Sequence, residues 1–479
     1  MSVRRLRFPV APARIAALGV ASLLLAVAAL LSSDSVNYSR GFNPLALALV
    51  VCFVAALGLL LAVTLDFPPE RAPWRRWRSG RWVMPARVAA TILLAALAVV
   101  AFLLSMGFLN TVLFQPTAHA YWNDVISFNA ANAQAVLSGR NPYTDDGNFL
   151  PTLIRYAQAP PTPIQGPIFG YGYNYPLLPR VFAIDRAYMR DPAAYASAFD
   201  PATLHSYPAL SFLLYVPLVA LGQDILWLHL LAYVALFVWL VALAPRDQRG
   251  WVALAAAAAV TIPLSTLMLD TEIICLVFLL VAWRYRSRRW VSALALGLGC
   301  AFKQYCWLFA PFLLVDALLR YGWREALKRA LIAGAAFLAP NLPFILMNPG
   351  AWLASVFLPV TGALFPQGMG LVALSLGRVL PGWPPLVYAV AELLAFAGAL
   401  WLFVRYRREL QESVLLLALA PLIFAFRSPA NYFAIAPWLA LYALLAIDRN
   451  RAARAADARV DTSSPSASTA SSSASVSAR

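Results

Sequence analysis

Charged residues are scarce in this sequence: Asp, Glu, Lys and Arg make up 12% of its 479 residues, while 62% are hydrophobic. Soluble domains carry about twice that share of charge and cannot bury so much apolar surface. The mean hydropathy of +0.70 points the same way. The composition therefore predicts a polytopic membrane protein surrounded by membrane lipids, and it argues against a soluble enzyme.

Cysteine and histidine are also rare, with four and three residues. The cysteines all lie in apolar stretches, where we interpret them as small core residues rather than as disulfide partners or metal ligands. The sequence contains no His-Glu-x-x-His motif, no paired-carboxylate metal spacing and no phosphate-binding P-loop. We therefore predict no metal site and no cofactor, and nucleotide hydrolysis has no support.

Acidic residues are outnumbered, 21 against 37 Lys and Arg, which gives a formal charge of +16. A basic protein can bind nucleic acid, but these basic residues form short blocks between apolar stretches, as the cytoplasmic loops of membrane proteins do. No basic stripe interleaved with aromatic residues is found on a soluble segment. We therefore expect no nucleic-acid partner.

Twelve stretches are apolar enough to be predicted as membrane spans. They are approximately 14–32, 46–66, 87–109, 226–245, 251–269, 271–284, 289–303, 304–319, 329–347, 384–404, 411–427 and 431–448. A thirteenth stretch, 207–222, is short and contains two prolines. If it does not cross and both termini are cytoplasmic, 28 of the 37 basic residues lie inside and 9 outside. The positive-inside rule thus favours twelve spans, with 207–222 as a re-entrant or interfacial helix on the outer face.

This topology divides the chain into three parts. Residues 1–86 form an N-terminal helix pair with a basic cytoplasmic loop, and residues 87–448 form a transmembrane module with two long outer loops, 110–225 and 348–383. Loops of that length are usually functional or disordered, and the many Tyr, Trp and Pro residues of the first favour an ordered cap. The Ser/Ala-rich tail, 449–479, is predicted to be disordered and cytoplasmic.

Asp124 is the first candidate site residue, because it opens a helix-like run just beyond the third span. The run ends at Gly139, with Pro142 beyond, which is a normal helix stop. One interpretation is that Asp124 only caps this helix. The other is that its carboxylate is a catalytic base held at the membrane surface.

Lys303 is the second candidate, because it is one of two lysines and interrupts an apolar region. An ionisable group there suggests function, and a lysine suits a phosphate, although snorkelling to the interface is the alternative. Asp270 and Glu272 lie at an outer hinge between two spans, where they either bind sugar hydroxyls or solvate a turn. Arg427 and Asn431 belong to a further outer hinge.

Four segments resemble those of a known family. They are "NDVISFNAANAQAVLSGRNPY" from Asn123, "YPALSFLLYVPLVAL" from Tyr207, "GLGCAFKQYCWLFAPFLL" from Gly297 and "NLPFILMNPGAWLASV" from Asn341. In order and predicted sidedness they resemble the GT-C superfamily of polytopic glycosyltransferases, and most of all glycosyltransferase family 87, with its polyprenyl-phosphate-mannose-dependent mannosyltransferases. The resemblance runs from about residue 87 to 435. The chain departs from the family's usual Gly-Gln-x-Asn hinge at Asp270 to Glu272, and from a common histidine near Asn431.

The resemblance implies an all-α, GT-C-like bundle of about twelve transmembrane helices in the plasma membrane, with interfacial helices and a catalytic first outer loop. It implies an inverting hexosyltransferase that uses a polyprenyl-phosphate sugar donor and a lipid or glycan acceptor on the outer face. The expected residues are Asp124 as catalytic base; Lys303 and Arg427 for the donor phosphate; and Asp270, Glu272, Gln304, Tyr207, Asn431 and His205 for the substrates. A lipid or sugar transporter and an inactive envelope scaffold are the alternatives.

Overall fold

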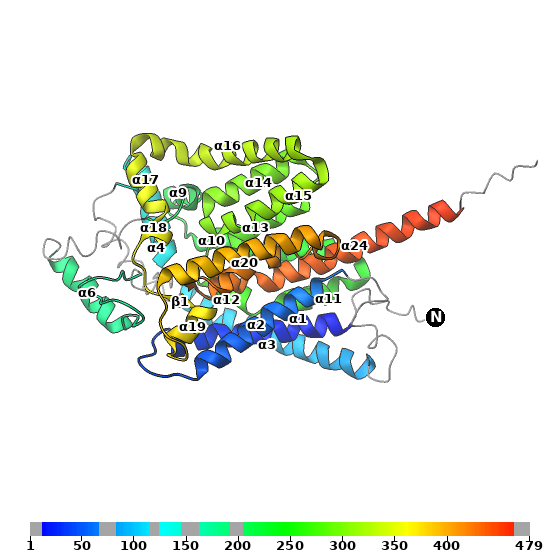
Figure 1. The fold of residues 1–479 in the computed structure, drawn as a ribbon, viewed down its shortest axis with the longest axis horizontal. Coiled ribbons are helices and arrows are strands. Elements are labelled where there is room, and N and C mark those ends of the chain that lie inside the picture. The colour runs from blue at the N-terminus through cyan, green and yellow to red at the C-terminus, as the bar shows by residue number, and fades with distance from the viewer. Residues whose placement is uncertain (1–11, 67–82, 115–123, 145–161, 192–204, 464–479) are drawn as a thin grey trace, which may run out of the picture.

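The structure is a computed structural model that describes residues 12–66, 83–114, 124–144, 162–191 and 205–463. It is built almost entirely of helices that run side by side along the long axis of the molecule (Figure 1). The predicted all-α membrane fold is thereby confirmed.

The long helices are α1 (Pro12–Leu31), α2 (Leu45–Thr64), α3 (Val83–Phe114), α10 (Leu226–Leu243), α16 (Trp323–Met347), α20 (Pro385–Arg405) and α24 (Ala436–Ser463). The shorter ones between them are α11 (Arg249–Ala257), α12 (Thr261–Leu267), α13 (Glu272–Arg284), α14 (Arg289–Phe302), α15 (Ala310–Tyr321), α21 (Arg407–Leu410), α22 (Val414–Leu417) and α23 (Asn431–Ala434), with η1 (Ser32–Val36), η4 (Arg246–Gln248), η5 (Gln304–Leu308) and η6 (Ala420–Ile423). The loop regions contain α4 (Asp124–Leu137), α6 (Leu178–Arg190), α8 (Leu210–Leu213), α9 (Val216–Ala220), α17 (Pro349–Val356), α18 (Leu358–Thr361), α19 (Leu371–Leu376) and the strands β1 (Gln367–Gly368) and β2 (Arg427–Ser428).

The exact count of twelve spans is not confirmed. In the described residues, seven helices are long and apolar enough to cross a membrane, or eight if α11 and α12, which meet at 61°, form one bent span. The predicted spans 271–284, 289–303 and 304–319 correspond to helices of 12 to 14 residues. At 1.5 Å per residue these are only about 20 Å long, against a hydrocarbon core of about 30 Å.

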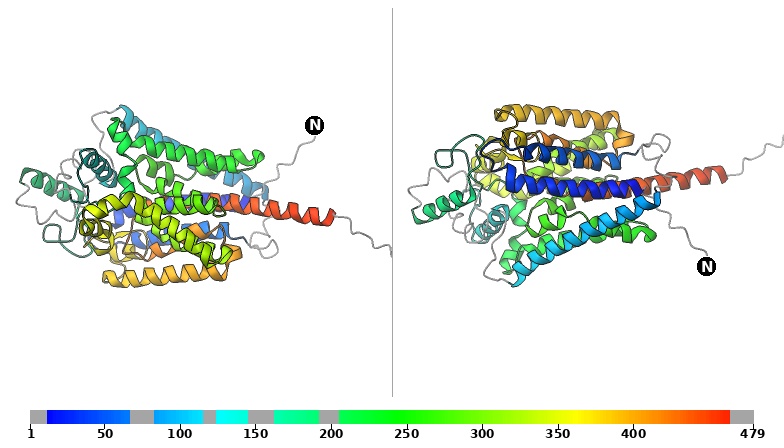
Figure 2. Two further views of the ribbon diagram at one scale, coloured as in Figure 1. Left: turned by 90° about the horizontal axis from the view of Figure 1, so that it is seen from above. Right: turned by 90° about the horizontal axis from the view of Figure 1, so that it is seen from below.

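The bundle has two distinct ends. One end carries α4, α6, α17, α18 and β1, and we call it the Asp124 end; α24 leads out of the opposite end, which we call the Glu412 end (Figures 1 and 2). The predicted interfacial segment 207–222 folds into α8 and α9, which pack on α4 at the Asp124 end. It therefore does not run the length of the bundle.

The N-terminal helix pair is an integral part of the bundle. α1 packs along α2 and α3, and α2 packs along α24, and their buried side chains belong to the same core as those of α10 to α15. Small residues such as Ala21 and Ala28 on α1, both fully buried, permit this close approach. At the other end of the chain, α24 continues past the predicted end of the last span at residue 448, because the following residues are mostly the helix formers Ala and Arg.

Candidate active site

The carboxylate of Asp124 is held by a segment from elsewhere in the chain. Asp124 is the first residue of α4, and its Oδ2 accepts hydrogen bonds from the Thr162 backbone N–H at 2.9 Å and from the Thr162 hydroxyl at 2.7 Å. Within the described ranges, no N–H of α4 donates to this carboxylate and no donor reaches Oδ1. The contacts are therefore not those of a helix cap. One oxygen of Asp124 is fixed and the other is open.

Lys303 lies at the break between α14 and η5, where its backbone is extended. Its side chain is 2% exposed, and Nζ donates to Glu272 Oε1 at 2.6 Å and to Thr271 Oγ1 at 2.8 Å. The rings of Tyr207 and Tyr432 cover the ammonium group, with centroids 5.4 and 5.3 Å from Nζ. Because Nζ does not reach the surface, snorkelling does not describe this lysine. Its charge is instead paired with Glu272.

Glu272 is fully buried and only half satisfied. Its Oε1 also accepts a hydrogen bond from Asn431 Nδ2 at 3.1 Å, whereas Oε2 has no partner in the described part of the chain. A buried acceptor without a donor costs about 1–3 kcal/mol, so such atoms are normally served by a ligand or an ordered water. Oε2 is therefore a candidate acceptor for a ligand hydroxyl or an ordered water.

The turn between α12 and α13 sets the positions of Asp270 and Glu272. Leu269 adopts the left-handed region with φ of 61°, which is rare for a residue with a branched side chain. The turn directs Asp270 back to the Ser265 hydroxyl, which donates to Oδ2 at 2.9 Å. The two carboxylates of this hinge therefore have different neighbours, and only Glu272 contacts Lys303.

Arg427 is held at the Asp124 end by a short parallel pairing of β1 and β2, in which Gln367 lies opposite Arg427. A Cβ atom at Gly368 would lie 2.5 Å from Ser428 Oγ, so a glycine is needed for the strands to approach. Arg427 Nη1 donates to the Phe365 carbonyl at 3.0 Å, and no carboxylate among the described residues forms an ion pair with it. Its positive charge is thus available to a ligand.

Two tyrosines, Tyr175 and Tyr207, are affected by the charges of these groups. Burial raises the pKa of Tyr175 to about 12, while the charge of Arg427 lowers it and the charge of Asp124 raises it further. Burial also raises the pKa of Tyr207. The charge of Lys303 lowers this pKa, whereas the charges of Asp124 and Glu272 raise it further. The field of Asp124 thus reaches a hydroxyl beside Arg427 and another beside Lys303. The charge of Asp124 therefore acts on a tyrosine beside each of the two predicted cations.

Two further predicted substrate residues, His205 and Gln304, are held by contacts within the protein. His205 is fully buried, shares a hydrogen bond of 2.9 Å with Ser211, and packs against aromatic rings; burial lowers its pKa to about 3. The side-chain amide of Gln304 donates to the backbone carbonyls of Ser206 and Val356, which ties η5 to the segment before α8 and to the last residue of α17. Both residues brace the surroundings of Tyr207.

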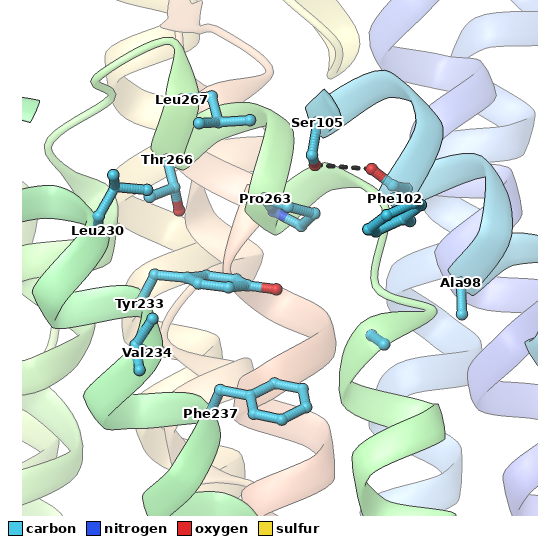
Figure 3. Close-up of a pocket in the computed structure, with 12 residues that line it drawn as sticks. Ala98, Phe102, Ser105, Leu230, Tyr233, Val234, Phe237, Pro263, Thr266 and Leu267 are labelled. Atoms are coloured by element: carbon cyan, nitrogen blue, oxygen red, sulfur yellow. Dashed lines mark hydrogen bonds between the residues drawn. The ribbon is translucent and has the colours of Figure 1, made fainter. Parts of the chain in front are cut away.

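An apolar cavity of about 320 Å³ lies between α3, α10 and the bend from α11 to α12 (Figure 3). Its lining is Ala98, Ala101, Phe102, Ser105, Leu230, Tyr233, Val234, Phe237, Ala257, Pro263, Thr266 and Leu267. The hydroxyls of Ser105 and Thr266 donate within their own helices, to the carbonyls of Ala101 and Ile262, so the cavity offers little polarity. Thr266 and Leu267 lead directly into the Asp270–Glu272 hinge.

The sequence analysis missed Thr162 and Tyr175. Tyr175 belongs to "IFGYGYNYPLLPRVF", whose aromatic content predicted an ordered cap, so a signal for it existed. Thr162 carries no local signal, because its contact with Asp124 spans 38 positions. In the described ranges, no group of three His, Cys, Asp or Glu residues is placed to hold a metal ion.

Comparison with known proteins agrees with this picture. Residues 205–429, from the segment before α8 to β2, match the model of glycosyltransferase family 87. No curated protein and no solved structure gives a significant match. The family match confirms the predicted resemblance and indicates a glycosyltransferase. It includes Lys303, Glu272 and Arg427, whereas Asp124 and the helices α1 to α4 lie outside the matched residues.

Proposed function

We propose that this protein is an inverting glycosyltransferase that moves mannose or a related hexose from a polyprenyl-phosphate donor to a hydroxyl group of a lipid or cell-envelope glycan. The family match supports sugar transfer, and the apolar helices support a reaction at a membrane. The observation that carries the mechanism is the carboxylate of Asp124, with one oxygen fixed by Thr162 and the other open.

In this mechanism Asp124 is the general base. Its Oδ1 accepts the proton of the acceptor hydroxyl while the hydroxyl oxygen bonds to the anomeric carbon of the donor. The bond from that carbon to the phosphate oxygen breaks at the same time, and the phosphate leaves with the electron pair. A positioned base of this kind contributes about 10²- to 10⁴-fold to the rate.

Arg427 and Lys303 are the two candidate cations for the leaving phosphate. Arg427 has no carboxylate partner in the described residues and offers a planar fork that matches phosphate oxygens. Lys303 is already paired with Glu272 and covered by two tyrosine rings. Arg427 is therefore the first candidate for direct contact, and Lys303 reaches the phosphate only by leaving Glu272.

The remaining groups serve the sugar and the lipid. Glu272 Oε2, with Asn431 beside it, is suited to accept a hydrogen bond from a sugar hydroxyl. The apolar cavity between α3 and α10 is suited to part of the isoprenoid chain, because it offers almost only carbon surface and ends near the Asp270–Glu272 hinge (Figure 3).

Cells that lack this protein test the proposal most broadly. They should accumulate an unused polyprenyl-phosphate sugar together with an acceptor that is one sugar short, both detectable by mass spectrometry of lipid extracts. The wild-type gene should remove both species, and a gene carrying Asp124→Asn should not. An unchanged pool of lipid-linked sugars would contradict the proposal.

The proposed orientation places the Asp124 end outside the plasma membrane and both termini in the cytoplasm. In a protein without native cysteines, Val360→Cys should react with an impermeant thiol reagent on intact cells, because Val360 is 83% exposed at the Asp124 end. Arg408→Cys at the Glu412 end should react only after permeabilisation. The opposite labelling pattern would reverse the orientation.

A further inference from the structure

The connection between α1 and α2 contacts two segments that lie near Arg427 in space. Arg40 Nη2 donates to the Tyr175 carbonyl at 2.8 Å, and the Tyr38 ring meets the Tyr175 ring edge-on, with centroids 5.6 Å apart. Asn37 Oδ1 accepts a hydrogen bond from the Gly368 N–H at 3.4 Å. The connection lies at the Asp124 end (Figure 1). It is outside residues 205–429, so the matched family region does not contain it.

Tyr175 connects the α1–α2 connection with the surroundings of Arg427. The charge of the Arg427 guanidinium opposes the effect of burial on the pKa of Tyr175. The Tyr175 ring also packs at 5.7 Å against Phe365, whose carbonyl accepts the hydrogen bond from Arg427 Nη1. Tyr38, Tyr175 and Phe365 belong to one small hydrophobic cluster. The carbonyl that holds the guanidinium therefore belongs to Phe365, whose ring packs on Tyr175, and Tyr175 in turn packs on the α1–α2 connection.

We infer that Arg40 and Tyr38 are positioning residues, which hold Tyr175 so that Arg427 is aligned with the phosphate of the donor. This inference rests on the proposed function. It gives the N-terminal helix pair a role in donor binding as well as in packing. Alignment matters because a displacement of about 1 Å in a positioned group can cost about 10²-fold in rate.

The side chains present suit this role. Arg40 is exposed and forms no ion pair with any described residue, and its guanidinium donates to the Tyr175 carbonyl. An edge-to-face pair such as Tyr38 with Tyr175 has a defined geometry and fixes the ring direction. Among the described residues, no hydrogen bond joins Arg40 or Tyr38 to Arg427, so their effect on the donor passes through Tyr175.

The chain offers a matched control for Arg40. Arg378 is also exposed, and its Nη2 donates to the side chain of Asn174, the neighbour of Tyr175, at 2.7 Å. Arg40→Ala and Arg378→Ala therefore each remove one arginine hydrogen bond to the same segment. Only the first releases Tyr175.

The test measures binding of a synthetic polyprenyl phosphate without sugar to the purified full-length protein, together with transfer kinetics and thermal stability. Arg40→Ala should weaken binding about tenfold, which corresponds to about 1.4 kcal/mol. The KM for the acceptor and the apparent Tm should stay at wild-type values. Arg40→Lys should restore part of the affinity. Tyr38→Leu should act like Arg40→Ala, whereas Tyr38→Phe, which keeps the ring, should be silent.

Two results would overturn the inference in different ways. If Arg40→Ala and Tyr38→Leu bind the lipid phosphate as well as wild type and Arg378→Ala do, the connection only packs and the inference alone fails. If the wild-type protein itself binds no polyprenyl phosphate, the proposed function fails, and the inference fails with it.

Discussion

The two ends of the bundle differ in how many of their carboxylates form ion pairs with basic side chains. All but one of the ion pairs between described residues lie at the Glu412 end. They join Arg286 to Asp316 and Glu412, Arg289 and Arg329 to Glu325, Arg320 to Asp316, and Arg451 to Asp66. Glu412 also accepts hydrogen bonds from Trp283, Gln411 and Asn450. The buried carboxylates Asp316 and Glu412 at this end are therefore each matched by an arginine of the protein.

The Asp124 end contains a single described ion pair, between Lys303 and Glu272. Around it, Arg427 has no carboxylate partner, Asp124 Oδ1 has no donor, and Glu272 Oε2 is buried without one, as far as the described residues extend. Buried polar groups are normally paired, and groups left open in one region are typical of functional sites. We therefore infer that the ion-paired residues stabilise the fold and that the charged groups without a partner among the described residues bind the ligand.

The largest effect expected is that of Asp124→Asn. The amide oxygen can still accept both hydrogen bonds from Thr162, but the side chain can no longer take a proton. Sugar transfer should fall by about 10²- to 10⁴-fold, the share of a general base, while expression, apparent Tm and donor binding stay normal. The assay is transfer of a radiolabelled sugar by purified protein.

Asp224→Asn is the control for this substitution, because Asp224 Oδ1 accepts from the Leu226 N–H at the start of α10 and asparagine caps a helix as well as aspartate. It should be silent. If Asp124→Asn is equally silent, Asp124 is no base, and Asp270 and Glu272 become the carboxylates to test.

Lys303→Ala should have the next largest effect, because it breaks the one matched pair at the Asp124 end. Removing the lysine leaves the Glu272 carboxylate buried without its counter-charge, which costs about 3–5 kcal/mol of stability. The apparent Tm should therefore drop sharply. The double variant Lys303→Met with Glu272→Gln should recover much of the loss. A Tm unchanged in Lys303→Ala would show that this pair does not stabilise the fold.

A smaller effect is expected at acid pH from His205, whose pKa is lowered to about 3 by burial. The unfolded chain takes up the proton near pH 6.5 and the folded protein does not, so stability is full above pH 6.5 and declines as the pH falls toward 3. At pH 5.5 the loss is about 1.4 kcal/mol. Tm measured at pH 7.5 and 5.5 should therefore fall less in His205→Gln than in the wild type. An equal fall would show that His205 does not titrate in this way.

Much of the local structure could be predicted from the sequence. Asp124 is the first residue of a helix that ends before Gly139, and Lys303 lies at the break between two helices, as predicted. These features depend on capping signals, helix stops and local hydropathy, which act over a few residues. Hydropathy also located the apolar stretches, but it did not reveal where a bend or a polar residue shortens a helix, as between α11 and α12.

The partners of the site residues could not be predicted. Glu272 lies 31 positions from Lys303, Thr162 lies 38 positions from Asp124, and the link from Tyr175 to Arg427 joins a loop to the last hinge. Such pairings are set by how the helices pack, and no pattern in a short window encodes them. For this reason the sequence suggested both Lys303 and Arg427 for the phosphate, and only the structure shows that Lys303 is paired with Glu272 while Arg427 has no carboxylate partner among the described residues.

The central claim is that charged groups without an ion-pair partner bind the ligand, whereas ion-paired groups stabilise the fold. Comparing Arg427→Gln with Arg286→Gln tests this claim most directly. The measurement is the affinity for a polyprenyl phosphate beside the apparent Tm of each purified variant. Arg427→Gln should lose about tenfold or more in affinity, that is about 1.4 kcal/mol or more, with an unchanged Tm. Arg286→Gln should lower the Tm, because Glu412 loses its counter-charge, and keep wild-type affinity at a temperature where it is folded. Equal affinities in the two variants, or a fall in Tm confined to Arg427→Gln, would contradict the account.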